Sequence, residues 1–221
     1  MTEILSSGVF LRILDVLITV AAAVLSITIH EVSHGFAAYK CGDDTAKIYG
    51  RLSLNPLKHI DWIGALCLVV FKFGWAKPVP VNSFNFKNRK RDIIIVSLAG
   101  PVSNFIIAFV AMLIVSALVI TSYPMQILAT FLITLVYLNI GLGVFNLIPV
   151  PPLDGSKILG EFLNSGAKYK YLSFERYGSL VLLLIFAIRP LNNIFSSVLM
   201  FLQGIVLTGY SKAIEFILGV F

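Results

Sequence analysis

The sequence has 221 residues, of which 58% are hydrophobic and 13% are charged, and its mean hydropathy is +0.92. Soluble domains carry a larger share of charged residues, so this composition excludes a water-soluble globular protein and predicts an integral membrane protein. The formal net charge is +6. The basic residues cluster between apolar stretches, as in the cytoplasmic loops of membrane proteins, which argues against nucleic acid as a partner.

The first apolar stretch, residues 16–39, is long enough to cross a hydrocarbon core of about 30 Å as a helix. It lacks the preceding basic region and the cleavage site of a signal peptide, so we expect a retained span. Its polar residues gather in the second half, where His30-Glu31-Val32-Ser33-His34 forms an HExxH motif. The motif lies about 20 Å into the helix, nearer to the end that leads to Lys40.

The HExxH motif combines metal ligands with a base. On a helix, His30 and His34 lie on one face, where both imidazoles can bind one Zn²⁺ ion, and Glu31 can act as general base beside it. HExxH also occurs by chance in unrelated chains. A charge inside the membrane costs on the order of 3 kcal/mol, however, so a glutamate at this depth is a candidate for function.

The distribution of basic residues predicts the orientation. Ten lysine and arginine residues lie within residues 40–91, whereas the connection around residues 122–124 has none. By the positive-inside rule, the long segment is cytoplasmic, and the HExxH motif lies toward the cytoplasmic face. Within this segment, residues 63–75 are apolar but too short to span, which predicts a re-entrant membrane hairpin.

Further apolar stretches predict the remaining spans. Residues 93–120 and 125–149 carry no charge and form spans two and three. Residues 178–220 are apolar but interrupted by Arg189-Pro190 and Gln203, so this region contains either one kinked span or two. We therefore expect an all-α polytopic membrane protein with about four to six transmembrane helices.

The expected domain organisation is simple. Residues 1–221 form a single integral-membrane domain, with a catalytic core at about residues 13–165 and C-terminal membrane helices at about residues 177–221. Because spans one and three both run from the outer to the cytoplasmic face, the residues that follow span three lie on the same side as the HExxH motif.

The end of span three supplies a candidate third ligand. Residues 146–155 read Asn-Leu-Ile-Pro-Val-Pro-Pro-Leu-Asp-Gly, and the prolines must end the helix. Irregular backbone at membrane depth is tolerated where protein or a water-filled cavity satisfies it. A catalytic zinc site has three protein ligands and one open position. Asp154, on the same side as His30 and His34, would complete that set.

Five motifs, in the same order, resemble those of the site-2 protease family of intramembrane zinc metalloproteases. They occupy residues 30–34, 50–56, 75–82, 99–104 and 146–155. The resemblance implies one Zn²⁺ ion per chain held by His30, His34 and Asp154, with Glu31 as general base. It also implies a hydrolase that cleaves peptide bonds in or near the transmembrane segments of membrane proteins, as in regulated intramembrane proteolysis. The chain resembles the compact catalytic-core type without PDZ or CBS domains.

Several polar residues need a separate interpretation. The oxyanion that develops during peptide hydrolysis requires a hydrogen-bond donor. We expect Asn146 to be a catalytic residue that supplies its amide, unless it caps or bridges helices, and Asn104 is a second candidate. A simpler role for Asn104 and Asn139 is hydrogen bonding between helices. His59 is expected to be a structural residue that pairs with Asp61.

Three other functions fit part of the pattern. A metal transporter predicts ligand pairs along several spans. A catalytically inactive module that binds membrane helices would tolerate the loss of Glu31. A different membrane zincin would use Glu161 as third ligand, although Glu161 lies in a predicted loop.

We expect a multi-pass protein of the cell membrane whose partners are the lipid bilayer and a transmembrane protein substrate; a regulatory membrane partner is compatible with the pattern.

Overall fold

The computed structural model describes residues 2–64, 77–120 and 126–219, and these residues form helices and no strand. Four helices are long and apolar enough to cross a membrane. They are α1 (Thr2–Lys40), α4 (Arg89–Ile120), α5 (Gln126–Leu147) and α9 (Arg189–Leu218). The prediction of an all-α polytopic membrane protein is therefore confirmed.

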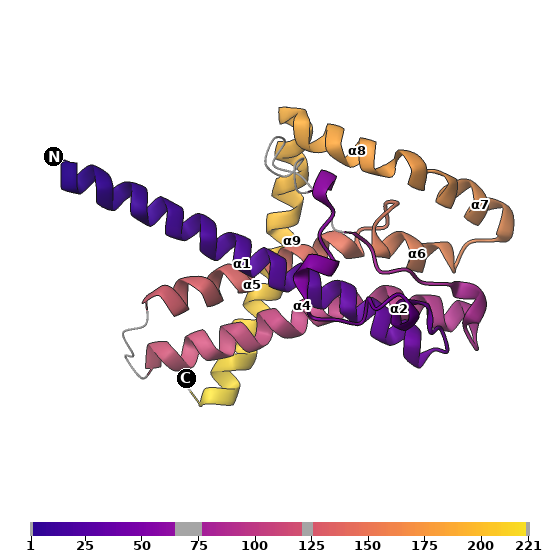
Figure 1. Ribbon diagram of the computed structural model, residues 1–221, viewed down its shortest axis with the longest axis horizontal. Coiled ribbons are helices and arrows are strands. Elements are labelled where there is room, and N and C mark those ends of the chain that lie inside the picture. The colour runs from indigo at the N-terminus through magenta and orange to yellow at the C-terminus, as the bar shows by residue number, and fades with distance from the viewer. Residues whose placement is uncertain (1, 65–76, 121–125, 220–221) are drawn as a thin grey trace.

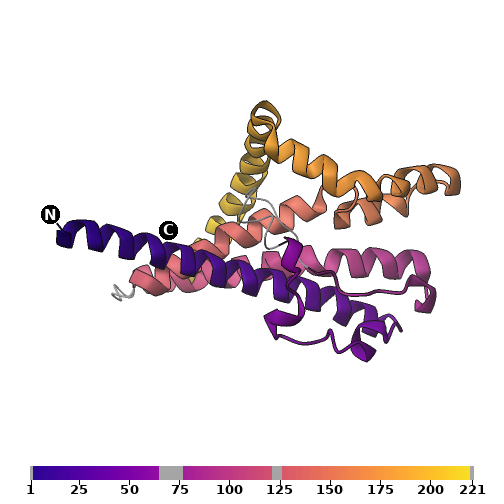
Figure 2. The same ribbon diagram turned by 45° about the horizontal axis from the view of Figure 1, so that its top comes forward.

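Helices α1, α4 and α5 lie side by side, and α4 runs antiparallel to the other two (Figures 1 and 2). Small residues let the three backbones approach closely, as is usual between helices in membranes. Gly143 of α5, for example, leaves room for the ring of Phe105, which would lie 2.9 Å from a Cβ atom at that position. The buried apolar core comprises Ala22, Ala108, Ala111, Leu132, Leu135, Val136, Ile140 and Val144.

The described residues of the segment between α1 and α4 include the short helices α2 (Thr45–Ile48), η1 (Pro56–Lys58) and η2 (Ser83–Asn85). The predicted hairpin at residues 63–75 falls almost entirely on residues 65–76, which lie outside the described residues. The backbone N–H of Lys77 donates to the carbonyl of His59 at 2.9 Å, and Arg51 Nη2 donates to the carbonyl of Lys77 at 2.7 Å. The described residues before and after this gap are therefore linked to each other by hydrogen bonds.

The C-terminal third begins with three short helices, α6 (Asp154–Gly160), α7 (Ser165–Ser173) and α8 (Glu175–Ala187). The apolar region 178–220, which predicted one span or two, breaks at Ile188, and Pro190 lies in the first turn of α9. Proline is tolerated there because the first helical N–H groups have no partner within the helix. Because α8 has only 13 residues, about 20 Å, it is too short to span. The region thus holds one spanning helix, α9, which crosses α5 at a steep angle (Figure 1).

Candidate metal centre

Three ligating side chains meet beside α4. His30 and His34 project from α1, and Asp154 is the first residue of α6. The Nε2 atoms of His30 and His34 are 3.0 Å apart, and they lie 3.3 and 3.1 Å from Asp154 Oδ2. None of the three side chains is more than 11% exposed. The structure therefore brings together the three residues that were predicted as ligands.

The spacing and chemistry of these donors fit a zinc ion. Zinc-to-nitrogen bonds are about 2.0–2.1 Å long, so two donors in a tetrahedral site lie about 3.3 Å apart. The donor atoms here are 3.0–3.3 Å apart. Two imidazole nitrogens that both point lone pairs at each other repel unless a cation or proton lies between them. Two imidazoles and one carboxylate leave one tetrahedral position open for chemistry.

The backbone carbonyl of Val96 sets the tautomer of His34. The Nδ1 atom of His34 lies 2.7 Å from this oxygen. Because a carbonyl only accepts, Nδ1 carries the hydrogen and donates, which leaves the lone pair of Nε2 directed at the other ligands. Val96 was not among the predicted site residues, because every residue carries a backbone carbonyl and the sequence does not show which of them will contact His34.

The proline-containing turn after α5 positions Asp154. Helix α5 ends at Leu147 and α6 begins at Asp154, as the prolines in this turn predict. A Cβ atom at Gly155 would lie 2.5 Å from the carbonyl carbon of Leu147 and still closer to its oxygen. Only glycine allows α6 to pack this tightly on the end of α5. The Asp-Gly pair therefore combines a candidate ligand with the residue that permits its placement.

Gly100, in the middle of α4, leaves space for the two imidazoles. A Cβ atom at this position would lie 2.5 Å from His30 Cε1, 2.7 Å from His30 Nε2 and closer still to His34 Nε2. Glycine costs about 1 kcal/mol in a helix interior relative to alanine. A glycine inside a predicted helix often indicates that another part of the protein packs closely against it. Gly100 was not among the residues assigned a role from the sequence.

Replacing Gly100 with alanine is expected to lower zinc affinity by at least about tenfold, because the methyl group displaces both imidazoles; changes next to metal ligands typically cost 10–100-fold. Competition with a zinc chelator on purified protein measures the affinity. Gly204→Ala is the matched control, since a Cβ atom there has nothing within 4 Å. An unchanged zinc affinity in Gly100→Ala would show that α4 does not confine the ligands.

Glu31 contacts the segment that precedes α4. Its Oε2 atom accepts a hydrogen bond of 2.8 Å from the backbone N–H of Val79. One turn further along α1, Gly35 makes room for this segment, because a Cβ atom there would lie 2.9 Å from Val79 Cγ1 and 2.7 Å from Leu52 Cδ2. The carboxylate next to His30 is therefore restrained by the backbone of residues far away in the sequence.

Asp43 fixes the same segment to the end of α1. Its buried carboxylate accepts hydrogen bonds from Asn82 N (2.7 Å), Asn85 Nδ2 (2.8 Å), Thr45 N (3.1 Å) and Thr45 Oγ1 (2.5 Å). Burial alone would raise the pKa of Asp43, but these hydrogen bonds outweigh it and hold the pKa below its ordinary value. The charged form is therefore favoured in the folded protein.

Asp43→Asn is expected to lower the free energy of unfolding by about 2 kcal/mol, because hydrogen bonds to a charged acceptor are lost. The stabilisation from Asp43 is complete above its unfolded-state pKa, about 3.9, and is lost as the pH falls through the lower folded-state pKa. Thermal unfolding at several pH values should show the two proteins converge in acid. Asp44→Asn, at an exposed position, is the control. Equal stability of Asp43→Asn and wild type at pH 7 would refute this role.

The three asparagines differ in their contacts. Asn139 Nδ2 donates to Ser26 Oγ at 2.7 Å, which joins α5 to α1 as predicted for an interhelical bond. Asn104 is fully buried, and its amide atoms have no partner among the described residues. Asn146 Nδ2 donates to the carbonyl of Leu142 in its own helix at 3.0 Å. Catalytic roles for Asn146 and Asn104 stay predictions.

The predicted pairing of His59 with Asp61 is wrong. His59 Nε2 donates to the carbonyl of Ser53 at 2.8 Å, and this imidazole is 2% exposed. Asp61 Oδ1 instead accepts from the backbone N–H groups of Ile63 and Gly64, both at 2.9 Å. An aspartate readily caps the two N–H groups that follow it, and this local interaction competes with an ion pair. His59 is a structural residue, but through a different partner.

Glu161 does not join the ligand cluster. Its Oε1 atom lies 2.5 Å from Lys168 Nζ, so its carboxylate is already paired. Within the described residues, one group of three or more histidine, cysteine or acidic side chains is close enough to hold a metal, and it consists of His30, His34 and Asp154. A transporter predicts ligand pairs along several spans, and the described residues contain no second group of this size.

Comparisons with known proteins add a family and several relatives. The model of the family described as Peptidase family M50 matches residues 120–189. The chain is 42% identical to YwhC of Bacillus subtilis, over 79% of this chain and 81% of that protein. It is 27% identical to Rip2 of Mycolicibacterium smegmatis, over 81% and 70%, and 30% identical to MJ0392 of Methanocaldococcus jannaschii, over 90% and 50%. The names of these three proteins assign them to the zinc metalloproteases. No solved structure matches the chain.

Proposed function

This chain belongs to peptidase family M50, the site-2 proteases, with zinc as its cofactor, and on that premise we propose that it is an intramembrane endopeptidase. It cleaves membrane-protein substrates within or beside their transmembrane segments. One observation supports the proposal: His30 and His34 lie in the part of α1, Gly8–Lys40, that is long and apolar enough to span a membrane, and they converge there on Asp154.

The proposed roles follow from the positions of the side chains. Bound zinc supplies a Lewis acid that polarises the scissile carbonyl and lowers the pKa of a water molecule. His30, His34 and Asp154 hold the ion. Glu31 takes a proton from the attacking water and passes it to the leaving amine. The N–H of Val79 restrains the Glu31 carboxylate while it does so.

We assign stabilisation of the oxyanion to Asn146, in the last turn of α5, eight residues before α6 begins. One hydrogen of its amide is used by the carbonyl of Leu142. An amide nitrogen has two hydrogens, so the second is free to donate to the oxygen that becomes negatively charged.

The site is proposed to face the cytoplasm. His30 and His34 lie in the last third of α1, which ends at Lys40, and α4 starts beside it with Arg89, Lys90 and Arg91. The positive-inside rule assigns this basic end to the cytoplasmic surface. A position near that surface supports access of water to a site that is otherwise enclosed by apolar helices.

A helical substrate must unwind before cleavage, because its internal hydrogen bonds shield the peptide carbonyls. Next to the cleavage site of a transmembrane reporter, we expect glycine to raise the cleavage rate about fivefold over leucine and proline to raise it at least about tenfold, in line with their helix propensities. Mass spectrometry of the products, from protease and reporter in liposomes, gives both rate and cleavage position. Equal cleavage rates for the proline, glycine and leucine reporters would contradict local unwinding. Cleavage only in extramembrane loops would contradict intramembrane proteolysis.

A further inference from the structure

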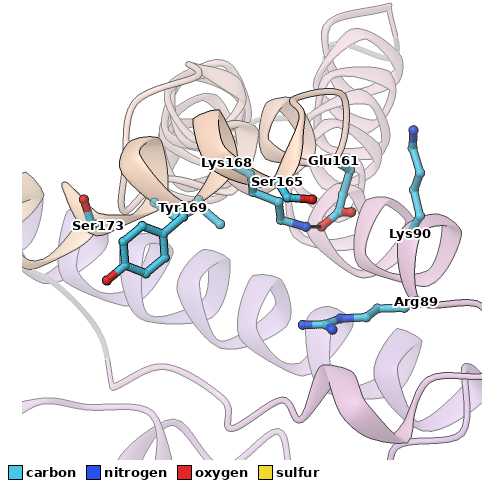
Figure 3. A pocket seen from close by; sticks show the side chains of 8 residues that line it. Arg89, Lys90, Glu161, Ser165, Lys168, Tyr169 and Ser173 are labelled. Carbon is cyan, nitrogen blue, oxygen red and sulfur yellow. Dashed lines mark hydrogen bonds and ion pairs between the residues drawn. The ribbon is translucent and has the colours of Figure 1, made fainter.

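A cavity lies away from the ligand cluster, where the start of α4 faces α7. Its volume is about 680 Å³, within the range of small-molecule sites. Figure 3 shows Arg89 pointing into the space between the two helices, with Lys90 at its edge. The polar side chains that line the cavity are Arg89, Lys90, Glu161, Ser165, Lys168, Tyr169 and Ser173.

The cavity carries uncompensated positive charge. Its carboxylate, Glu161, is 2.5 Å from Lys168 Nζ, so these two charges neutralise each other (Figure 3). Arg89 and Lys90 have no ion pair with any described residue. The neighbouring Arg91, by contrast, is paired with Asp92 at 2.8 Å. Two cations in the cavity wall therefore have no counter-charge among the described residues.

Aromatic rings hold both cations in place. The guanidinium carbon of Arg89 lies 4.9 Å from the ring centre of Phe84, and Lys90 Nζ lies 5.1 Å from that of Phe162. Such cation–π contacts order a side chain without neutralising its charge. A guanidinium with ordered geometry binds two oxygens of a phosphate at once. The hydroxyl groups of Ser165, Tyr169 and Ser173 also line the cavity.

The location of the cavity indicates the source of the phosphate. Arg89 is the first residue of the spanning helix α4, so the cavity lies at the membrane surface, within reach of lipid headgroups. A substrate segment at this surface would be basic by the positive-inside rule and would be repelled. We propose that this cavity binds the phosphate headgroup of an anionic phospholipid.

The short helix α6 connects this cavity to the ligand cluster. It starts at Asp154 and ends at Gly160, next to Glu161 in the cavity wall. A headgroup that contacts this wall restrains the far end of the helix that carries the third ligand. This consequence rests on the proposed protease site, whereas binding of the lipid does not.

Lipid binding can be measured on the purified protein in neutral detergent by native mass spectrometry with added phosphatidylglycerol. The test variant is Arg89→Gln with Lys90→Gln. The matched control is Lys40→Gln with Lys47→Gln, which removes the same charge from two lysines that also lie over rings, those of Phe36 and Tyr39. We expect at least tenfold weaker binding in the test variant and less than threefold in the control.

Phosphatidylcholine and inorganic phosphate distinguish the alternatives. Selective retention of phosphatidylglycerol over phosphatidylcholine, not displaced by millimolar inorganic phosphate, supports the proposal. Equal loss of binding in both variants would mean general surface electrostatics and would overturn it. Displacement by inorganic phosphate would indicate a free-anion site instead of a lipid site and would also overturn the proposal.

Two controls accompany the measurement. Both variants should melt at the wild-type temperature in the absence of lipid, which verifies that they are folded. Arg89→Lys, which keeps the charge but loses the planar guanidinium, should bind the lipid with intermediate affinity. Zinc content is measured in parallel, so failure of lipid binding and failure of the metal site are separable.

Discussion

Replacement of Asp154 with alanine is expected to remove zinc from the purified protein. Without the carboxylate, two neutral imidazoles remain, and the charge that balances the cation is lost. Loss of groups next to metal ligands typically costs 10–100-fold in affinity, so loss of a direct ligand should exceed about 100-fold. Metal analysis of the purified variant and titration with zinc in a chelator buffer measure content and affinity.

The control for this substitution is Glu161→Ala. Glu161 is the other acidic residue considered as third ligand, and it pairs with Lys168 in the structure. The Glu161→Ala variant should therefore keep one zinc ion per chain. If Glu161→Ala lost zinc and Asp154→Ala retained it, the assignment of the third ligand would be reversed.

Glu31→Gln is expected to abolish proteolysis while one zinc ion per chain is retained. The amide cannot take up the proton of the attacking water, and general-base catalysis is worth about 10²–10⁴-fold in rate. Glutamine has nearly the same shape, and its oxygen can still accept from the N–H of Val79, so the fold should be unaffected. Cleavage of a transmembrane reporter and zinc content are measured on the same preparation.

Glu175→Gln serves as the control for Glu31→Gln, because Glu175 is an exposed residue at the start of α8. It should cleave at the wild-type rate. A residual activity of Glu31→Gln above about one tenth of wild type would rule out the proposed role as general base.

The ligand cluster was predictable because each of its residues has a signature of type or position. The spacing of His30 and His34 puts both on one helix face. The charge distribution gives the direction of the spans, and the prolines end the third span near Asp154. These arguments predict that the three side chains lie on the same side of the membrane, and in the structure they do lie together.

The residues that restrain the cluster could not be predicted in the same way. The carbonyl of Val96 and the N–H of Val79 are backbone groups that any residue carries, and their contacts depend on how distant segments pack. The fit of Gly100 against both imidazoles likewise depends on the approach of α4 to α1. Such information lies in tertiary structure, and only the glycine within a helix hinted at it.

The wrong pairing of His59 and the open number of C-terminal spans both have local causes. The pairing of His59 with Asp61 failed because short-range capping of Ile63 and Gly64 uses the aspartate. The number of spans after α7 depended on where the apolar region breaks. Arg189-Pro190 marked that break, and the structure starts α9 there, leaving α8 too short to cross.

The most direct test of intramembrane proteolysis is cleavage of a transmembrane reporter by the purified protein in liposomes, with the cleaved bond identified by mass spectrometry. We predict cleavage within or next to the membrane segment, loss of cleavage after zinc chelation, and recovery when zinc is added back. Cleavage that persists after the bound zinc has been removed would contradict the account, and so would a zinc-loaded, folded protein that cuts reporters only in their soluble loops.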